Sequence, residues 1–261
     1  MTARLSLGTV FFHWDAATLR DFYFRIADEA PFDIVHVGEV VCSKRAPFFA
    51  PHLGEVIERL KSAGKTVVLS SLALVTSERE RREARELAAQ EELLVEGNDV
   101  GILAALEGKP HVVGPFVNVY NAATLGYFAR RGAIRACLPA ELPARSIGPI
   151  AQEAAAELEV IAWGRLPLAI SARCFHARAH RLHKDGCQFV CARDPEGMVV
   201  RTLEGEPFLA VNGLQTLSYT WCNLVCELGT LRGFGVGVFR LVPMRADMVA
   251  VAETFRATLD G

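Results

Sequence analysis

Short apolar segments, rich in β-branched residues, alternate along this chain with longer segments whose apolar residues recur with a helical period. The apolar segments predict strands at residues 5–12, 34–41, 66–72, 100–105, 112–119, 133–138, part of 159–170 and 235–241. The periodic segments predict helices at residues 18–30, 53–63, 77–94, 122–131, 147–157 and 246–259. The chain therefore repeats a unit of one strand followed by one helix.

The ends of several predicted helices carry matching signals. Ser77 precedes an acidic first turn and can cap the amides there. Gly64 and Gly132 stand where a helix must end before the next strand begins. In residues 53–63, apolar side chains recur at i, i+3, i+4 and i+7, so that one stripe of the helix can pack on a sheet.

Repeated strand–helix units predict parallel strands joined by right-handed crossovers. About eight such units in 261 residues match the size of a (β/α)8 TIM-like barrel. An open doubly wound sheet is the alternative, but Gly8 stands alone after the first strand, without a dinucleotide-binding glycine motif. We therefore predict an α/β fold with one barrel-like domain over residues 1–261.

One segment, residues 174–205, breaks this alternation. It is basic, contains several histidines and carries turn signals at Asp185-Gly186 and Asp194-Pro195-Glu196-Gly197. Irregular inserts of this length inside a compact domain tend to be functional. We predict that residues 174–205 are a cysteine-containing insert that serves a binding site.

Composition narrows the functional classes. Apolar residues make up 51% of the chain, which supports a large core, and the net charge of -2 argues against nucleic-acid binding. Apolar runs have the length of strands, so no membrane span is expected. The first residues lack the apolar core of a signal peptide, which predicts a cytoplasmic protein. The seven cysteines are then expected to be reduced thiols.

Four of these cysteines form the most informative pattern. Cys42 follows the strand predicted at residues 34–41, and Cys174 follows the strand that ends near residue 170. Parallel barrel strands end on one face, so these two thiols are expected to converge. Cys187 and Cys191 are spaced i, i+4, and one helical turn would place both sulfurs on one side. Four thiolates suit either an iron–sulfur cluster or a structural zinc ion.

The surroundings of these cysteines leave both metals open. Nearby cations, which lower thiol pKa and offset thiolate charge, are Lys44, Arg45, Arg173, Arg178, Arg181, Lys184 and Arg193. His176 and His180 are spaced i, i+4 and could bind a metal in a helix, although single histidines there are more often exposed. Cys222 and Cys226 lie in an apolar, helix-like stretch and are interpreted as core residues, as is Cys137.

Polar residues near predicted strand ends are further candidates for a substrate site. These are His36, Glu39, Asn98, Asp99, Asn118, Asn121, Glu159 and Arg165. Capping or loop hydrogen bonding is the competing interpretation for each of them. His36 fits a satisfied core histidine, and Glu159 follows a helix and could face the opposite end of the barrel.

Three motifs resemble the collagenase-like peptidase superfamily. They are residues 163–169 (Trp-Gly-Arg-Leu-Pro-Leu-Ala), 171–174 (Ser-Ala-Arg-Cys) and 187–191 (Cys-Gln-Phe-Val-Cys). Within that superfamily, residues 41–45 (Val-Cys-Ser-Lys-Arg) and the later cysteine spacing resemble the UbiV family of oxygen-independent ubiquinone biosynthesis. The resemblance covers nearly the whole chain, although the loops near residues 199–213 look shorter than in that family.

The resemblance implies a cofactor, partners and a reaction. It implies one [4Fe-4S] cluster bound by Cys42, Cys174, Cys187 and Cys191, and a heterodimer with a UbiU-like paralogue. The pair is implied to hydroxylate the ubiquinone ring without molecular oxygen, with prephenate as the oxygen donor and a UbiT-like lipid-binding accessory protein. Four protein ligands leave no open iron, so the expected role of the cluster is electron transfer or structural support.

Two other functions remain as alternatives. One is a peptidase of the same superfamily, although the sequence shows neither a Ser/His/Asp order nor a His-Glu-x-x-His motif. The other is a non-enzymatic binding subunit stabilised by zinc.

Overall fold

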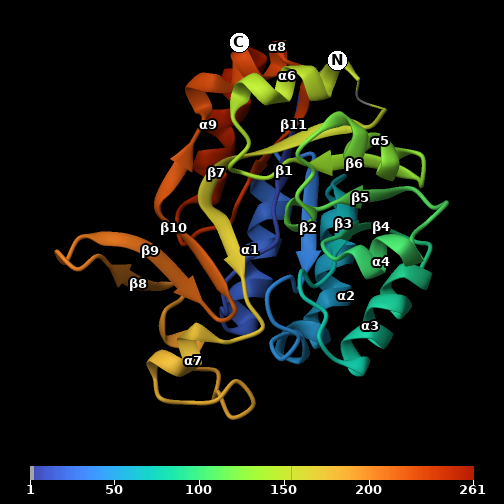
Figure 1. The fold of residues 1–261 in the computed structure, drawn as a ribbon. Coiled ribbons are helices and arrows are strands. Elements are labelled where there is room, and N and C mark those ends of the chain that lie inside the picture. Colours follow the sequence, from blue (N-terminus) through green and yellow to red (C-terminus); the bar gives the residue numbers. More distant parts are fainter. Residues whose placement is uncertain (1–2, 154) are drawn as a thin grey trace.

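A computed structural model describes residues 3–153 and 155–261. Within them, eight parallel strands close into a barrel, because β7 and β11 pair with each other across the seam (Figure 1). In spatial order the barrel strands are β11 (Val236–Leu241), β1 (Arg4–Leu7), β2 (Ile34–Gly38), β3 (Thr66–Ser70), β4 (Leu94–Gly97), β5 (His111–Val113), β6 (Ala133–Cys137) and β7 (Glu157–Ile170). The predicted (β/α)8 fold is confirmed.

Helices surround the barrel and bury its outer face (Figure 1). They are α1 (Ala16–Glu29), α2 (Ala46–Ser62), α3 (Glu78–Ala89), α4 (Val100–Ala105), α5 (Ala122–Ala129), α6 (Ala144–Gln152), α8 (Leu228–Gly233) and α9 (Met248–Asp260), with short helical turns η1 (Pro115–Val117) and η3 (Val225–Glu227). Ser77 caps α3 in a full capping box with Glu80, as its sequence context predicts. Among the described residues, no helix combines the length and the apolar character needed to cross a bilayer.

The strand predicted at residues 100–105 is wrong. These residues form α4, which Asp99 caps by accepting a hydrogen bond from the Gly101 amide at 2.7 Å. The fourth barrel strand is instead β4, Leu94–Gly97, which begins at the last residue of the helix predicted at residues 77–94. β4 is short and carries the charged residue Glu96 into the barrel, so it lacks the apolar run by which a strand is recognised.

A second difference is an antiparallel extension beyond the barrel. β7 runs past the barrel mouth and pairs with β10 (Gln215–Asn223), which continues through β9 (Pro207–Asn212) to β8 (Met198–Arg201) (Figure 1). The helix-like interpretation of Cys222 and Cys226 is therefore wrong, since Cys222 lies in β10 and Cys226 in η3. The core interpretation is also wrong for Cys226, which is exposed because η3 lies at the surface, while Cys222 is half-buried. Between β7 and β8, residues 174–205 also hold α7 (Phe175–Ala179) and η2 (Val190–Arg193).

The barrel interior is built in layers from alternate residues of each strand. One apolar layer contains Ile34, Val68, Val112 and Val238. Two residues further along their strands, the same inward face presents His36 and Arg240. The second layer is therefore polar and charged, although it is completely enclosed.

Arg240 is the centre of this buried layer. Its guanidinium donates to both oxygens of Glu159, at 3.0 and 2.9 Å, and also to Glu96. Burial alone would raise the pKa of both glutamates, but Arg240 and the other positive charges and hydrogen bonds around them together outweigh burial and hold the pKa of each carboxyl below its usual range. His36 packs against the same guanidinium at 3.2 Å, and burial with this cation lowers the pKa of His36 to about 4. The buried layer is thus stable only with Arg240 charged and His36 neutral.

Replacing Arg240 with Met should destabilise the fold strongly. Two buried carboxylates would lose their cation, which typically lowers the free energy of unfolding by about 3–5 kcal/mol. Urea unfolding followed by tryptophan fluorescence measures this. Arg82→Met, on an exposed face of α3, is the matched control and should change stability by no more than about 0.5 kcal/mol. Equal losses in the two variants would contradict a central role for Arg240.

His36 should make stability depend on pH between 7 and 5. Its pKa is about 4 in the folded protein and 6.5 ordinarily, so on acidification the unfolded state gains a proton that the folded state does not. The free energy of unfolding should fall by about 2 kcal/mol from this group. In His36→Gln, the fall in the free energy of unfolding between pH 7 and pH 5 should be smaller than in the wild type by about 2 kcal/mol. An identical loss in both proteins would show that His36 does not cause it.

Candidate functional site

The four predicted cysteines lie around one small cavity. Cys42 comes from the loop after β2, Cys174 from the segment after β7, and Cys187 and Cys191 from the segment around η2. All of these segments lie at the carboxyl ends of the barrel strands, at the bottom of the view in Figure 1. The four thiols are free, and Cys174 and Cys191 are buried while Cys42 and Cys187 are half-buried. The structure thus brings together residues that are up to about 150 positions apart in the sequence.

Cys174 is held at the start of α7 by its own sulfur. The Sγ atom accepts a hydrogen bond from the Ala177 amide at 3.4 Å, and it lies 3.4 Å from the Gly213 carbonyl oxygen, to which the thiol donates. These two contacts, together with the start of α7, fix the position of this sulfur at the cavity.

Cys187 and Cys191 are not joined by one turn of α-helix as their spacing predicts. Gln188 and Phe189 between them have φ values of 49° and 51°, in the left-handed region, and only then does the short helix η2 begin. Both sulfurs nevertheless line the same cavity. Two successive non-glycine residues in this conformation cost energy, and such backbone conformations are concentrated at functional sites.

Cys42 is positioned by Glu39. One oxygen of this carboxylate, Oε1, accepts hydrogen bonds from the amides of Val41 and Cys42 at 2.8 and 2.9 Å, which fixes the turn after β2. Burial is the main cause that raises the pKa of the Cys42 thiol, while Arg45 opposes the rise. The sequence suggested that nearby cations lower the pKa of these thiols. For Cys42 the net effect is a raised pKa, because burial outweighs Arg45.

Arg45 is the cation most closely associated with the cysteines. It is only 3% exposed, lines the cysteine cavity, and opposes the rise that burial causes in the pKa of the Cys191 thiol. Its guanidinium also donates to the Phe11 carbonyl at 3.0 Å and to Asn212 Oδ1 at 2.6 Å. A buried guanidinium with these fixed contacts offsets negative charge on the thiolates without being free to move away.

Asn212 on β9 joins Arg45 to the cysteine segment. While its oxygen accepts from Arg45, its Nδ2 donates to the carbonyl oxygens of Cys191 and Asp194 at 3.1 and 2.8 Å. Asn212 is completely buried. One amide side chain thus ties η2, the antiparallel extension and the barrel mouth together.

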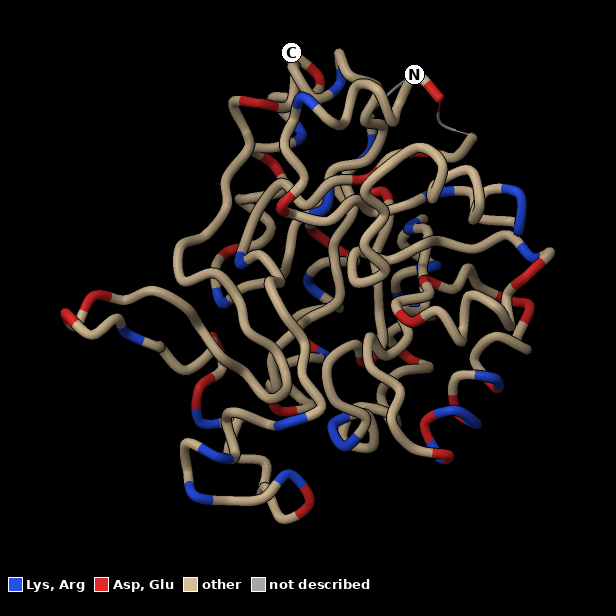
Figure 2. The backbone as a smooth tube through the Cα atoms, viewed as in Figure 1, with Lys and Arg blue, Asp and Glu red and all other residues tan. Residues whose placement is uncertain are grey.

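The remaining cations surround the site at different distances. Lys44 and Lys184 line the cavity with Arg45, and Lys44 Nζ donates to the Lys184 carbonyl at 2.7 Å. Figure 2 shows basic residues along the segment that projects below the barrel. Those on the segment are Arg173, Arg178, Arg181 and Arg193. The positive charge expected near the thiols is therefore partly in the cavity wall and partly on the surface around it.

The spacing of the four sulfurs bears on which metal they fit. One zinc ion holds its sulfurs at about 2.3 Å in a tetrahedron, which places each pair about 3.8 Å apart. In the described part of the chain, the groups of three or more potential ligand atoms within 4.8 Å of one another consist of His, Asp and Glu and include none of these cysteines. A cubane cluster binds each thiolate through a different iron and accepts a wider spacing. Four thiol donors around one cavity suit the cluster that the resemblance implies, and among the described residues no three of these thiols lie as close together as one zinc ion would hold them.

The groups of potential ligand atoms that do lie within 4.8 Å of one another are separate from the cysteine cavity. In one, His176 is completely buried, with its Nε2 2.9 Å from Asp194 Oδ2, and its ring stacks on that of His180 at 5.3 Å. The expectation that histidines here are exposed is therefore wrong for His176. In the other, His36, Glu96 and Glu159 surround the guanidinium of Arg240, which supplies the positive charge that a metal would bring.

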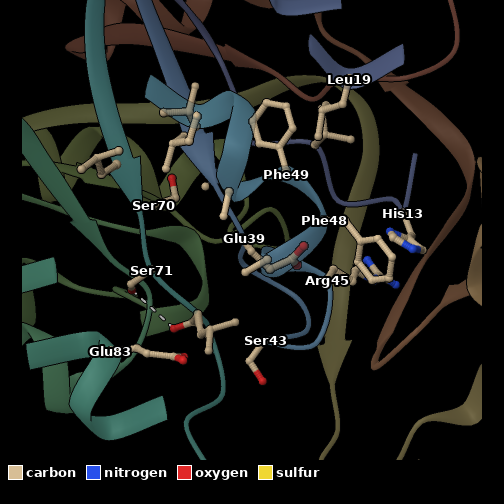
Figure 3. Close-up of a pocket in the computed structure, with 18 of the residues that line it drawn as sticks. His13, Leu19, Glu39, Ser43, Arg45, Phe48, Phe49, Ser70, Ser71 and Glu83 are labelled. Atoms are coloured by element: carbon tan, nitrogen blue, oxygen red, sulfur yellow. Dashed lines mark hydrogen bonds between the residues drawn. The ribbon is translucent and has the colours of Figure 1, made fainter. Parts of the chain in front are cut away.

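A larger cavity of about 350 Å³ opens at the same end of the barrel, beside the cysteines. Its walls come from the loop after β1, the helices α1, α2 and α3, and the ends of β2 and β3 (Figure 3). They are mostly apolar, with Glu39 and Arg45 among the few charged groups. Sequence reasoning identified Glu39 but not this cavity, because its apolar walls have the same helix periodicity as core residues.

Two contacts join this large cavity to the cysteine cavity. Arg45 lines both of them. Phe48, which lines the large cavity, packs edge-to-face on Phe189 at 4.7 Å between ring centroids, and Phe189 lines the cysteine cavity. His13 completes this aromatic group at 5.2 Å from Phe48, and burial with Arg45 lowers the pKa of His13 to about 4.

The other polar candidates fall outside both cavities. Asp99 and Asn121 cap α4 and α5, and Asn118 adopts a left-handed turn after η1 with φ 60°. His36, Asn98 and Glu159 are buried in the barrel interior, so Glu159 does not face the far end of the barrel. Arg165 on β7 donates to the Ser218 carbonyl at 2.9 Å. For these residues the capping and core interpretations hold.

The fold and site define a TIM-barrel protein with a four-cysteine centre at its mouth. The sequence matches peptidase family U32 over residues 14–260, and the chain belongs to that family. This match agrees with the resemblance to the collagenase-like superfamily seen in the motifs.

Some solved structures resemble this chain at low sequence identity. A D-psicose 3-epimerase with D-tagatose from Clostridium cellulolyticum H10 is 11% identical, with a TM-score of 0.45 and coverage of 98% of this chain and 97% of that chain. An uncharacterized protein from Clostridium thermocellum that binds two copies of 5-methyl-5,6,7,8-tetrahydrofolic acid is 8% identical, with a TM-score of 0.44 and coverage of 99% and 95%. At this level the likenesses carry no information about ligands.

Gly213→Ala should disturb the cysteine site through Arg45. Gly213 has φ +66°, and an added Cβ would lie 2.3 Å from the Arg45 guanidinium. Left-handed strain costs about 1–2 kcal/mol, and displacing the buried guanidinium should add about 1–3 kcal/mol. Urea unfolding measures the loss, and iron content after anaerobic purification should fall with it.

Gly205→Ala is the matched control for this prediction. Gly205 also has a positive φ, +89°, but nothing lies within 4 Å of its Cβ position. It should therefore show the conformational strain alone and keep its metal. If the two alanine variants lose equal stability and metal, contact with Arg45 is not what requires glycine at position 213.

Proposed function

We propose that this chain is the [4Fe-4S]-binding subunit of an oxygen-independent hydroxylase in ubiquinone biosynthesis. It acts with a UbiU-like partner, with prephenate as the oxygen donor and a UbiT-like lipid-binding protein in the same pathway. The observation that carries the proposal is the convergence of Cys42, Cys174, Cys187 and Cys191 on one cavity. These are the cysteines that the resemblance to the UbiV family selects, and membership of family U32 is consistent with it.

The cluster would be held by these four thiolates and would supply one-electron redox chemistry at the barrel mouth. Around it, the residues of the chain have distinct roles. Arg45 offsets the charge of the thiolates, and Asn212 keeps both Arg45 and the Cys191 segment in place. The Ala177 amide donates to Cys174. Hydrogen bonds and charges at the sulfurs are among the factors that set the reduction potential of such a centre.

A cluster with four protein ligands has no open iron for substrate. Its role in this proposal is therefore to transfer electrons or to support the site, while substrate chemistry takes place beside it. Half-buried Cys42 and Cys187 leave the centre close to the surface. A partner subunit could reach it there, which suits a two-subunit enzyme. The seven free thiols also suit the reducing cytoplasm expected from the sequence.

Family membership also keeps peptidase activity as a second candidate. Purified protein that cleaves denatured collagen or peptides, and loses this activity on a single substitution in the large cavity, would favour it. A chain that holds one zinc ion and no iron would favour the third candidate, a zinc-stabilised binding subunit.

Protein purified without oxygen should be brown and contain about four iron and four sulfide per chain. Cys174→Ala should lose most of the iron and the visible absorption. Cys137→Ala and Cys226→Ala are controls, because the first thiol is enclosed near the barrel core and the second is exposed outside the site. Iron and sulfide analysis with a visible spectrum measures all four proteins. A colourless wild-type chain, or equal iron in Cys174→Ala, would contradict the proposal.

The pathway itself is tested in cells that grow without oxygen and lack their own UbiV-type subunit. The chain and a UbiU-like partner should copurify and restore ubiquinone formation, and Cys174→Ala should not restore it. If a chain without these four cysteines restored ubiquinone formation, its role in the pathway would not depend on a cluster.

A further inference from the structure

We propose that the 350 Å³ cavity binds a hydroxylated aromatic ring that carries an apolar substituent, with the hydroxyl group placed between Glu39 and Arg45. The inference deepens the proposed function and rests on it for the identity of the natural ligand, since it assigns binding of the ring to this chain. The binding site itself follows from the chemistry of the cavity walls.

The walls favour an apolar ring. Aromatic side chains from three segments line the cavity, among them Trp14 after β1, Tyr23 on α1 and Phe49 on α2. Leu53 and Leu87 add aliphatic surface from α2 and α3. Pockets of this size with mostly apolar walls and a few convergent polar groups are the usual form of a small-molecule site. An apolar substituent on the ring would use the remaining length of the cavity.

The position of Phe48 also indicates a ligand-binding mouth. This large apolar side chain is 47% exposed, yet it lines the cavity beside His13 (Figure 3) and also contacts Phe189. Burial with Arg45 keeps His13 neutral at physiological pH, so the mouth carries no added charge from this histidine. An uncharged aromatic mouth suits the passage of an uncharged ring.

Glu39 and Arg45 form the polar end of the cavity. Glu39 uses Oε1 for the amides of Val41 and Cys42, and the hydrogen bonds among the described residues leave its Oε2 free. Arg45 is 3% exposed. Its Nε is a buried hydrogen-bond donor that has no partner among the described residues. A hydroxyl group can donate to the free carboxylate oxygen and accept from the guanidinium.

The same two residues connect the ligand to the cysteine centre. Glu39 fixes the backbone of Cys42, and Arg45 lines both the large cavity and the cysteine cavity. A ring in the cavity would thus be separated from the cysteine loops by single side chains. Reduction and oxidation at the centre and binding of the ring should influence each other through Arg45.

The test uses 4-butylphenol as the probe, with isothermal titration calorimetry on anaerobically purified protein. Binding should saturate at one site per chain, and quenching of Trp14 fluorescence should follow the same curve. Butylbenzene, which lacks the hydroxyl group, should bind roughly tenfold or more weakly, because it leaves both polar partners unsatisfied. Equal affinity for the two compounds would overturn the assignment of the polar end.

Two variants of α3 locate the site. Ala84 lines the cavity, so Ala84→Phe should fill it and abolish phenol binding. Ala89 lies on the same helix but is exposed, and Ala89→Phe should leave the affinity unchanged. Undiminished binding in Ala84→Phe, or no saturable binding in the wild type, would overturn the inference.

Iron and sulfide analysis of the same samples separates this inference from the proposed function. Ala84→Phe should remain brown, because it touches none of the cysteines. A brown wild-type chain that does not bind the phenol contradicts the inference alone. A colourless chain that binds it contradicts the cluster and leaves the cavity assignment standing.

Discussion

The arrangement at the barrel mouth depends on the buried guanidinium of Arg45. Removing this cation from water is costly unless its donors and its charge are matched on every side. The Phe11 carbonyl and Asn212 supply acceptors, and Glu39 supplies negative charge. Thiolates at the cysteine cavity would complete the balance. Because each acceptor belongs to a different segment, Arg45 draws the first β–α loop, the β2–α2 loop and the late cysteine segment into one site.

A second buried arginine plays a different part. Arg240 sits inside the barrel with Glu96, Glu159 and His36, all of them enclosed by strands. None of these groups lines either cavity at the mouth. The interior network thus stabilises the frame, while the Arg45 network organises the site. This division matches the general plan of barrel proteins, in which stability resides in the closed sheet and chemistry in the loops at its carboxyl end.

Much of this could be predicted from sequence, for identifiable physical reasons. The alternation of apolar and helical segments indicates a closed barrel, and Cys42 and Cys174 follow strands whose ends share one face. Prediction from the local sequence pattern was wrong where contacts between distant segments decide the structure. β4 is too short and too polar to be recognised, and Asp99 starts a helix where apolar residues suggested a strand. The long β7 pairs with a strand that begins 45 residues after β7 ends, which no local period reveals. The roles of Arg45 and Asn212 depend on contacts between distant segments and carry no sequence signal of their own.

The account centres on the claim that the four cysteines bind one iron–sulfur cluster. X-ray absorption of protein purified without oxygen tests this most directly, because it reports both the element and its neighbours. The account predicts an iron edge, a first shell of sulfur and a second shell of iron, all lost in Cys174→Ala. A zinc edge with a single sulfur shell and no metal neighbour would contradict it.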